Sequence, residues 1–212
     1  MSAMGRLYDE TFGRLFSAMY DRMIKGTEEA GLKETRRHAL ASARGRTIDI
    51  GAGTGANLGL YPPAVTELVL AEPDPHMLKR LRPKSGEAEI VQAPAAELPF
   101  EDDRFDTAVF TLVLCTVPDP AAALAEAARI LRPGGQLLFV EHVRAEDPAL
   151  ARWQDRLERP WRFCGDGCHC NRDTVAAIEA TALKLEEVEK GELPKAPPIV
   201  RPLVWGRAVL PA

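Results

Sequence analysis

A glycine-rich segment is the candidate ligand-binding loop of this chain. Residues 49–57 read DIGAGTGAN and place Gly51, Gly53 and Gly55 directly after a short β-branched run. Because glycine lacks a Cβ atom, such a loop can turn sharply and bring its backbone close to a ligand. The spacing of Gly51, Gly53 and Ala56 also fits a dinucleotide site, so the loop alone is a weak signal for any one ligand.

Of two acidic residues beside this loop, Asp49, together with Gly55 in the loop, favours S-adenosylmethionine over a dinucleotide, whereas Glu72 fits either ligand. Asp49 precedes the glycines, where a negative charge suits the cationic methionine end of that cofactor and would repel a pyrophosphate. Glu72 ends the next apolar run, where a carboxylate can accept hydrogen bonds from both hydroxyls of a ribose. A dinucleotide-dependent dehydrogenase or an inactive binding fold is the alternative at this point.

His142 and Asp166 are the candidate catalytic residues. His142 follows an apolar run, and an imidazole has the pKa range of a general base. Asp166 stands between two glycines and could orient that histidine or act itself. The alternatives are structural, with His142 fixing a loop and Asp166 forming a turn. Trp153, Trp161 and Cys168 could line an acceptor pocket, although both tryptophans could equally belong to the core.

The segment Cys164–Cys170 gathers three of the four cysteines, together with an aspartate and a histidine. Such side chains can bind zinc, but zinc sites usually contain Cys-x2-Cys pairs, and the spacing here is Cys-x3-Cys-x-Cys. We therefore predict no metal, and we expect the cysteines of a cytosolic chain to stay reduced. A site that binds a soft acceptor such as arsenic through these cysteines is the alternative.

Short apolar runs alternate with helical patterns through most of the chain. The predicted strands span 46–50, 68–71, 89–92, 107–111, 137–140, 185–188 and 203–210. The predicted helices span 76–81, 120–131, 149–159 and 172–183, with an irregular stretch at 160–171. This alternation predicts a parallel sheet with helices on both faces, in which ligands bind at the carboxyl ends of the strands. The glycine loop and His142 then lie at the same edge of the sheet.

Residues 1–44 read as helical and form a predicted cap or lid before a single domain at 45–212. Apolar residues recur there at steps of three and four and make one wide apolar face: Phe12, Leu15, Phe16, Met19, Tyr20, Met23 and Ile24. This face could pack on the domain, close over the site or lie on a membrane surface. Lys and Arg do not line the opposite, polar face of the helix strongly enough to favour the membrane.

Further motifs carry a resemblance to known enzymes. Leu98-Pro-Phe100 with Phe105-Asp106, and Leu131-Arg-Pro-Gly-Gly135, together with the glycine loop resemble the class I S-adenosylmethionine-dependent methyltransferases. A second set is similar to the methyltransferase-like family whose animal members are thiol S-methyltransferases: residues 57–63, 111–117, 141–143, 153–154, 160–161, 166–168 and 200–202. The animal members carry an apolar N-terminal anchor, whereas this chain has the amphipathic face, so membrane attachment is not implied.

The resemblance implies one doubly wound, Rossmann-like α/β sheet of seven strands, mostly parallel, with one antiparallel strand near the C-terminus and an N-terminal helical lid. It implies S-adenosylmethionine as cofactor and S-adenosylhomocysteine as product. The implied cofactor contacts are Asp49, Gly51, Ala52, Gly53, Asn57, Glu72, Pro73, Met77, Ala95, Ala96, Thr111 and Leu112. Many relatives carry an acid that contacts the adenine amino group where this chain has Pro94, so that contact is in doubt here.

The expected activity is methyl transfer to a small-molecule acceptor, with a thiol favoured by the closer resemblance. Carbon or oxygen methylation of a quinone-like ring and a non-catalytic S-adenosylmethionine-binding role are the alternatives. The mild net charge of −4 argues against a nucleic-acid partner. No run approaches the ~20 apolar residues of a membrane span, although a peripheral membrane contact stays open. We expect a cytoplasmic protein, and the sequence leaves its oligomeric state undetermined.

Overall fold

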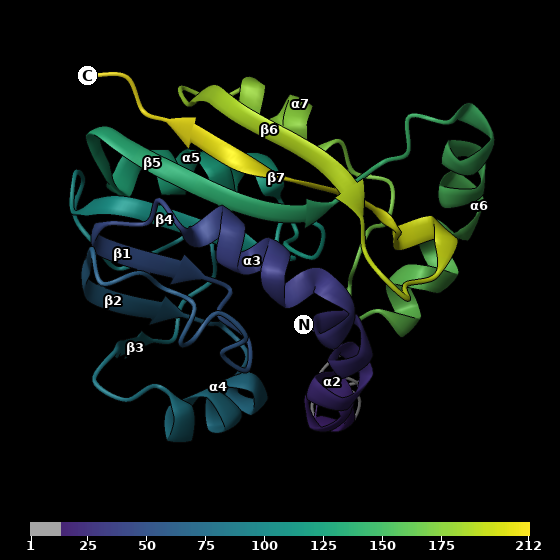
Figure 1. Ribbon diagram of the computed structural model, residues 1–212, viewed down its shortest axis with the longest axis horizontal. Coiled ribbons are helices and arrows are strands. Elements are labelled where there is room, and N and C mark those ends of the chain that lie inside the picture. Colours follow the sequence, from purple (N-terminus) through teal and green to yellow (C-terminus); the bar gives the residue numbers. More distant parts are fainter. Residues whose placement is uncertain (1–13) are drawn as a thin grey trace.

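One seven-stranded sheet forms the centre of the molecule, and the computed structural model describes residues 14–212 (Figure 1). The strand order is β3-β2-β1-β4-β5-β7-β6. The strands are β1 Gly45–Ile50, β2 Val65–Ala71, β3 Glu89–Val91, β4 Phe105–Thr111, β5 Leu131–His142, β6 Lys184–Glu192 and β7 Pro202–Val209. β7 pairs antiparallel with β5 and β6, and all other pairs are parallel. The predicted doubly wound sheet with one antiparallel strand near the C-terminus is confirmed.

Helices cover both faces of this sheet. They are α2 Arg14–Thr27, α3 Lys33–Leu40, α4 Pro75–Leu81, α5 Pro120–Ile130, α6 Pro148–Cys164 and α7 Thr174–Glu179, with the short turns η2 Glu28–Leu32, η3 Arg82–Lys84 and η4 Pro198–Val200. α3 contacts β5 and β7. α5 contacts β5, α7 contacts β6, and these two helices also contact each other. Figure 1 shows α3 in front of the sheet, α5 and α7 behind it, and α6 beyond the arrowhead of β5.

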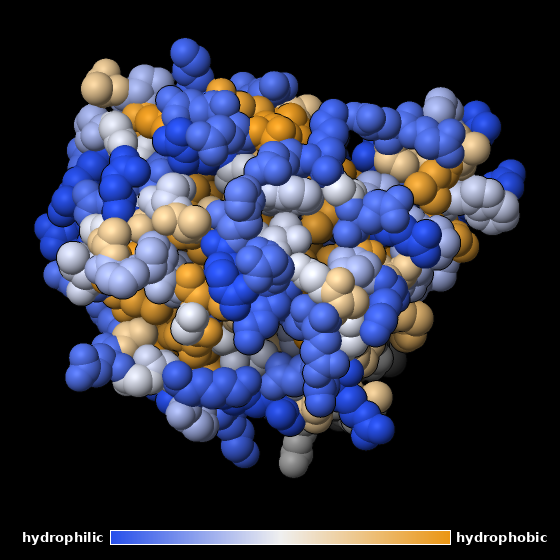
Figure 2. All heavy atoms as spheres, in the orientation of Figure 1, coloured by the Kyte–Doolittle hydropathy of each residue, from blue (hydrophilic) through white to orange (hydrophobic). Residues whose placement is uncertain are grey.

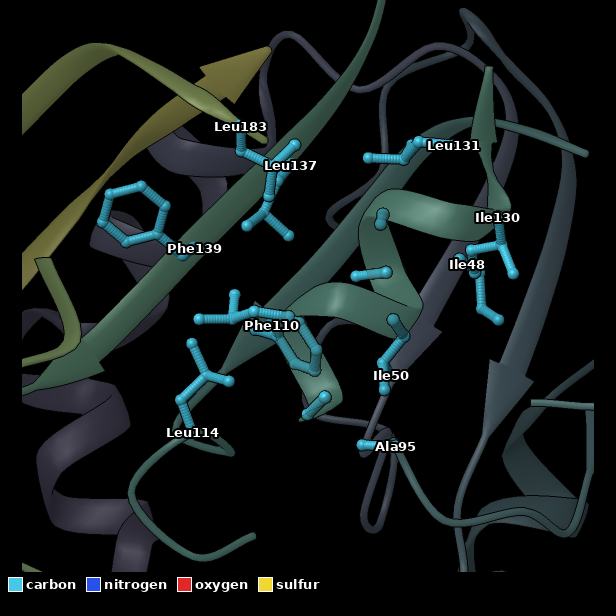
Figure 3. Packing of buried hydrophobic residues seen from close by; sticks show 14 of the residues in the cluster. Ile48, Ile50, Ala95, Phe110, Leu114, Ile130, Leu131, Leu137, Phe139 and Leu183 are labelled. Atoms are coloured by element: carbon cyan, nitrogen blue, oxygen red, sulfur yellow. The ribbon is translucent and has the colours of Figure 1, made fainter. Parts of the chain in front are cut away.

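Each face of the sheet carries its own apolar layer. Ile50, Phe110 and Phe139 come from three neighbouring strands and are buried in the layer under α5 and α7, as Figure 3 shows. Val109 and Leu138, one position earlier on their strands, belong to the layer under α3. Because successive side chains of a strand point to opposite faces, the central strands must be apolar at every position. The continuous apolar runs in the sequence follow from this burial.

Aspartate followed by proline begins three of the helices. Asp74, Asp119 and Asp147 accept hydrogen bonds from backbone N–H groups of the first turn of α4, α5 and α6. A proline occupies the start of each helix, where it removes no hydrogen bond, because the first N–H groups of a helix have no acceptor within the helix. These caps place the amino ends of the helices at the carboxyl edge of the sheet, and the helix starts predicted near 76, 120 and 149 are confirmed within one residue.

Several element boundaries differ from the sequence prediction, and three of them have a clear physical reason. α6 continues through Pro160 to Cys164, because a proline removes only the bond of its own N–H and the later turns stay bonded. α7 covers only part of the predicted helix, since Asp173 is its N-cap and the chain turns away after Glu179. β5 begins at Leu131 rather than at 137, because that residue pairs with the start of β4.

The N-terminal helical region is confirmed over its described part. The π-helical turn η2 joins α2 to α3, and Gly31 bends the chain there with a φ of 143°. Tyr20 and Ile24 of the predicted apolar face are partly buried, whereas Met19 and Met23 are exposed. The other side chains of that face lie outside the described residues: Phe12, Leu15 and Phe16. Figure 2 shows the surface on the α3 side, where hydrophilic residues separate small hydrophobic patches.

Candidate active site

The glycine loop leaves β1 at the carboxyl edge of the sheet with left-handed backbone angles. Gly51, Gly53 and Gly55 have φ values of 75°, 55° and 88°, which residues with a side chain rarely adopt. A Cβ atom at Gly51 would lie 2.6 Å from the Val113 side chain, whereas one at Gly53 would meet nothing closer than 4.0 Å. The loop is therefore packed against the segment after β4 on one side, and its backbone can be approached on the other.

Asp49 is buried at the end of β1 and belongs to a polar network beneath the loop. Asn57 Nδ2 donates to Asp49 Oδ2 at 3.0 Å and to Thr111 Oγ1 at 2.9 Å. Arg36 of α3, which is 2% exposed, donates to Asn57 Oδ1 at 3.1 Å and to Glu28 at 3.1 Å. Burial raises the pKa of Asp49, against the opposing effects of Asn57 and Arg36. Asp49 Oδ1 is buried and makes no close hydrogen bond within the described chain, and the nearby Tyr61 hydroxyl acts to lower the pKa of this carboxyl.

Glu72 directly follows β2 and faces the glycine loop. Its Oε2 accepts a hydrogen bond from the Gly53 N–H at 2.8 Å, and its Oε1 accepts one from the Asp74 N–H at 2.9 Å. Burial raises the pKa of Glu72 to about 7, although both N–H bonds favour the ionised form. The carboxylate therefore changes its charge in the neutral pH range.

The residues expected around an adenine ring lie at the ends of the adjacent strands β2 and β3. Met77 on α4 and Ala95 after β3 are buried, whereas Pro73 and Ala96 are exposed. Gln92 Nε2 donates to the Pro73 carbonyl at 3.1 Å and joins the turns that follow the two strands. The structure thus brings this predicted group to one edge of the glycine-loop region.

α2 lies against the glycine loop. Thr54 Oγ1 donates to Asp21 Oδ1 at 2.5 Å, and Lys84 Nζ donates to Asp21 Oδ2 at 3.2 Å and to the Thr54 carbonyl at 2.9 Å. Burial raises the pKa of the neighbouring Tyr20 to about 12, with Arg36 acting to lower it and Cys115 acting to raise it. The described part of the N-terminal region therefore contacts the loop and also approaches the segment after β4.

A buried carboxylate holds the segment that leaves β4. Glu141 Oε1 accepts hydrogen bonds from the N–H groups of Val113 at 2.8 Å and Leu114 at 3.0 Å. The preceding Leu112 has a φ of 58°, which is uncommon for a leucine, and its N–H donates to the Val140 carbonyl at 2.8 Å. Burial raises the pKa of Glu141 to about 7. The unusual turn after β4 is thus fixed from the neighbouring strand β5.

His142 ends β5, and its buried imidazole contacts a sulfur atom. His142 Nε2 lies 3.0 Å from Cys168 Sγ, and Trp161 Nε1 donates to the same sulfur at 3.3 Å. The sulfurs of Cys115 and Cys168 and a ring nitrogen of His142 all lie within 4.8 Å of one another. Hydrogen bonds from Cys115, His142 and Trp161 hold the pKa of the Cys168 thiol well below its usual range, against the effect of burial. These surroundings favour a thiolate.

Two other predicted site residues are not among the groups that surround the Cys168 sulfur. Asp166 has a left-handed φ of 51° in the loop after α6. The catalytic role of Asp166 stays a prediction. Trp153 is 54% exposed on the outer side of α6, where the Arg156 guanidinium lies 5.7 Å from the centre of its ring. The structure therefore brings Trp161, and not Trp153, to Cys168.

The fold separates the cysteines that are close in sequence. Cys164 is exposed at the end of α6, whereas Cys168 faces His142. Cys170 is buried, and its thiol donates to the Gln154 carbonyl at 3.5 Å. The group that surrounds Cys168 is therefore built from distant parts of the chain and not from the segment 164–170.

Gln154 has a structural position beneath this region. Its Oε1 accepts a hydrogen bond from the Ala145 N–H at 2.7 Å. Its Nε2 lies within 3.0 Å of three backbone carbonyls, those of Val143, Cys170 and Ile199. This one buried side chain joins α6 to the end of β5, to the cysteine segment and to η4.

Three residues of the site were not predicted as site residues from the sequence: Arg36, Cys115 and Glu141. Arg36 lies among other charged residues of its helix, and nothing in the sequence distinguishes it from Arg37. Cys115 is far in sequence from the other cysteines. Glu141 had a usable signal, because an acid at the end of a buried apolar strand needs a hydrogen-bond partner.

Comparisons with known proteins identify the family of this chain. A methyltransferase domain family matches residues 48–139. Thiol S-methyltransferase TMT1B of Homo sapiens is 36% identical over 177 residues, which cover 80% of this chain and 72% of that protein. Thiol S-methyltransferase TMT1A of Homo sapiens is 34% identical over 170 residues, which cover 76% of this chain and 69% of that protein. The chain belongs to this methyltransferase family.

Solved structures show the same fold as this methyltransferase. N-methyltransferase NodS of Bradyrhizobium japonicum, in complex with S-adenosylhomocysteine, matches with a TM-score of 0.64 at 16% identity, over 85% of this chain and 87% of that chain. Membership of the family makes the protein an S-adenosylmethionine-dependent methyltransferase. Among the described helices, none is both long enough and apolar enough to cross a membrane.

Proposed function

We propose that this methyltransferase moves the methyl group of S-adenosylmethionine to the sulfur of a small thiol. The observation that carries the proposal is the group around Cys168, where His142, Trp161 and Cys115 all approach one sulfur atom. An imidazole, an indole N–H and a thiol stabilise a sulfur in its ionised form, here that of Cys168. The same kind of surroundings suits the ionised, nucleophilic sulfur of an acceptor thiol. The two human relatives are named thiol S-methyltransferases, which supports the same acceptor class.

The polar network at the end of β1 fits the cofactor. The buried carboxylate of Asp49 suits the ammonium group of the methionine moiety, and the neighbouring Arg36 suits its carboxylate. Glu72 in its ionised form suits the ribose hydroxyls. The buried side chains of Met77 and Ala95 suit the flat apolar faces of adenine.

The reaction requires an ionised acceptor sulfur that is held in line with the methyl group. When bound, the cofactor supplies an electrophilic methyl group on a positively charged sulfur. Opposite charges cancel along the path, so a site that excludes water favours the transfer. Alignment depends on the segment after β4, which Glu141 fixes through the N–H groups of Val113 and Leu114.

A methyl-transfer screen with labelled S-adenosylmethionine tests this proposal. The acceptors are alkyl thiols, phenols, amines and quinols. We expect label on the thiols with the wild-type enzyme and with the control Asp102→Asn, which changes an exposed carboxylate before β4. Asp49→Asn should lose transfer because it removes the buried charge beneath the glycine loop. Label on quinols alone would favour ring methylation, and cofactor binding without any labelled acceptor would indicate a non-catalytic role.

A further inference from the structure

Three potential metal ligands meet at the carboxyl edge of β4 and β5. Cys115 comes from the segment after β4, His142 from the end of β5, and Cys168 from the loop after α6. Their ligand atoms all lie within 4.8 Å of one another. Cys115 and His142 are buried, whereas Cys168 is partly exposed. The cluster is therefore enclosed by the protein except on the side of Cys168.

Hydrogen bonds fix the two cysteine segments relative to each other. The N–H of His169, next to Cys168, donates to the Cys115 carbonyl at 2.8 Å. Arg172 Nη1 donates to the carbonyls of Leu114 at 2.5 Å and Val117 at 2.7 Å, on either side of Cys115. Side chains that are already held together need little ordering when they bind an ion, which increases affinity. The cluster therefore has the character of a preformed site.

We propose that Cys115, His142 and Cys168 bind one Zn²⁺ ion, and that its fourth coordination position takes the sulfur of the acceptor thiol. The second part rests on the proposed thiol methyl transfer. Two cysteines, one histidine and an open position form a known type of catalytic zinc site. Two thiolates and a neutral imidazole balance the charge of the ion, so the buried group carries no net charge.

The geometry accepts a tetrahedral ion after small movements. Zinc bonds of about 2.3 Å to sulfur and about 2.1 Å to nitrogen place a sulfur and a nitrogen ligand roughly 3.6 Å apart. His142 Nε2 and Cys168 Sγ are 3.0 Å apart, so the two side chains must separate by about half an ångström. The indole N–H of Trp161 already donates to Cys168 Sγ at 3.3 Å, as outer hydrogen bonds do at metal-bound thiolates.

This proposal departs from the sequence prediction of no metal, which considered only the spacing within 164–170. Cys164 is exposed, and Cys170 donates to the Gln154 carbonyl. Neither cysteine belongs to the cluster, so their spacing from Cys168 says nothing about the ligand set. Cys115 supplies the second sulfur from a distant part of the sequence.

A zinc-bound thiol needs no separate general base. The acceptor sulfur forms a bond to zinc and its S–H proton passes to water, because a coordinating thiol is deprotonated. The sulfur then donates an electron pair to the methyl carbon while the bond from that carbon to the cofactor's sulfur breaks. The products are a neutral thioether and S-adenosylhomocysteine, and the thioether, without a negative charge, leaves the ion. His142 acts in this scheme as a ligand.

The test replaces Zn²⁺ by Co²⁺, whose absorption reports sulfur ligands and tetrahedral geometry. Full-length protein is purified with reductant, freed of metal by a chelator and titrated with Co²⁺. We expect one equivalent to bind to the wild type and to the control Cys164→Ser. Cys168→Ser and Cys115→Ser should weaken binding by more than about 100-fold, because they remove ligands rather than outer contacts. An alkyl thiol added to the Co²⁺ protein should then shift its visible bands.

Circular dichroism of the metal-free variants checks that each one is folded, and Cys168→Ser is the decisive variant because its side chain is partly exposed. Equal Co²⁺ binding by Cys168→Ser and the wild type would overturn the metal site. Bands that do not respond to thiols would overturn the open coordination position, as would full thiol methylation by metal-free enzyme. An intact metal site in an enzyme that methylates no thiol would refute the proposed acceptor and leave the metal site supported.

Discussion

Glu72 should make nucleoside binding depend on pH. The carboxylate must be ionised to accept hydrogen bonds from ribose hydroxyls, yet burial raises its pKa to about 7. Protonation therefore competes with binding as the pH falls through that value. For a pKa of about 7, the apparent dissociation constant rises by a factor of roughly ten between pH 8 and pH 6. Glu72→Gln should remove this dependence and weaken binding at pH 8 by about 10- to 100-fold, since hydrogen bonds to charged groups contribute ~1.5–3 kcal/mol.

Calorimetric titration with 5′-methylthioadenosine measures this effect. That ligand keeps the ribose and adenine but lacks the amino and carboxyl groups that titrate in S-adenosylmethionine. Glu67→Gln is the matched control, because it makes the same change at an exposed position of β2. Affinity that is constant from pH 6 to pH 8 in the wild type, or a pH dependence that persists in Glu72→Gln, would refute the assignment of Glu72 to the ribose.

Three further substitutions test the loop, the scaffold and the polar network. Gly51→Ala should lower the free energy of unfolding by about 2–4 kcal/mol, because the added Cβ overlaps the segment after β4. The control Gly59→Ala has a similar φ but open space around it, so it should lower the free energy of unfolding by only about 1 kcal/mol. Gln154→Leu should lower the free energy of unfolding by about 3 kcal/mol, because it leaves buried backbone groups unpaired. The same change at the exposed Gln92 should lower it by less than about 1 kcal/mol. Urea denaturation measures the stability of all four variants. Arg36→Met should weaken S-adenosylhomocysteine binding at least about tenfold in calorimetry.

Each of these predictions has a result that would contradict it. Equal losses at Gly51 and Gly59 would mean that backbone angle alone determines the cost. A Gln154→Leu protein as stable as the wild type would mean that water replaces the lost bonds. Arg37→Met changes an exposed neighbour on the same helix, and equal affinities in Arg36→Met and Arg37→Met would remove Arg36 from the cofactor site.

The fold could be predicted from the sequence because its signals are local. Asp74 and Asp119 cap helices within the same few residues, and continuous apolar runs such as 107–111 reflect burial on both faces of one strand. The boundaries that failed depend on distant partners. β5 extends back to Leu131 only because the start of β4 lies beside it, and no property of residues 131–136 alone indicates this pairing.

The two halves of the site, the glycine loop and the cysteine–histidine cluster, differ in how far the sequence predicts them, for the same reason. Asp49, the glycines and Asn57 lie within one short segment, so their types and spacing in the sequence already indicate a ligand loop. Cys115 and Cys168 meet only because β4 and β5 are neighbours in the sheet and the loop after α6 folds back over their ends. Proximity within the segment 164–170 does not predict proximity in space, because its three cysteines have different surroundings.

The segment after β4 connects the two halves of the site mechanically. Gly51 can pack against Val113 only because it has no side chain. Val113 lies two residues before Cys115, and its N–H donates a hydrogen bond to Glu141. The uncommon left-handed angle of Leu112 starts this segment, and such angles persist only where the surroundings determine them. Transfer of a methyl group requires alignment to within a fraction of an ångström. A short segment fixed at both ends can provide that alignment between the glycine loop and the cysteine–histidine cluster, whereas a mobile loop could not.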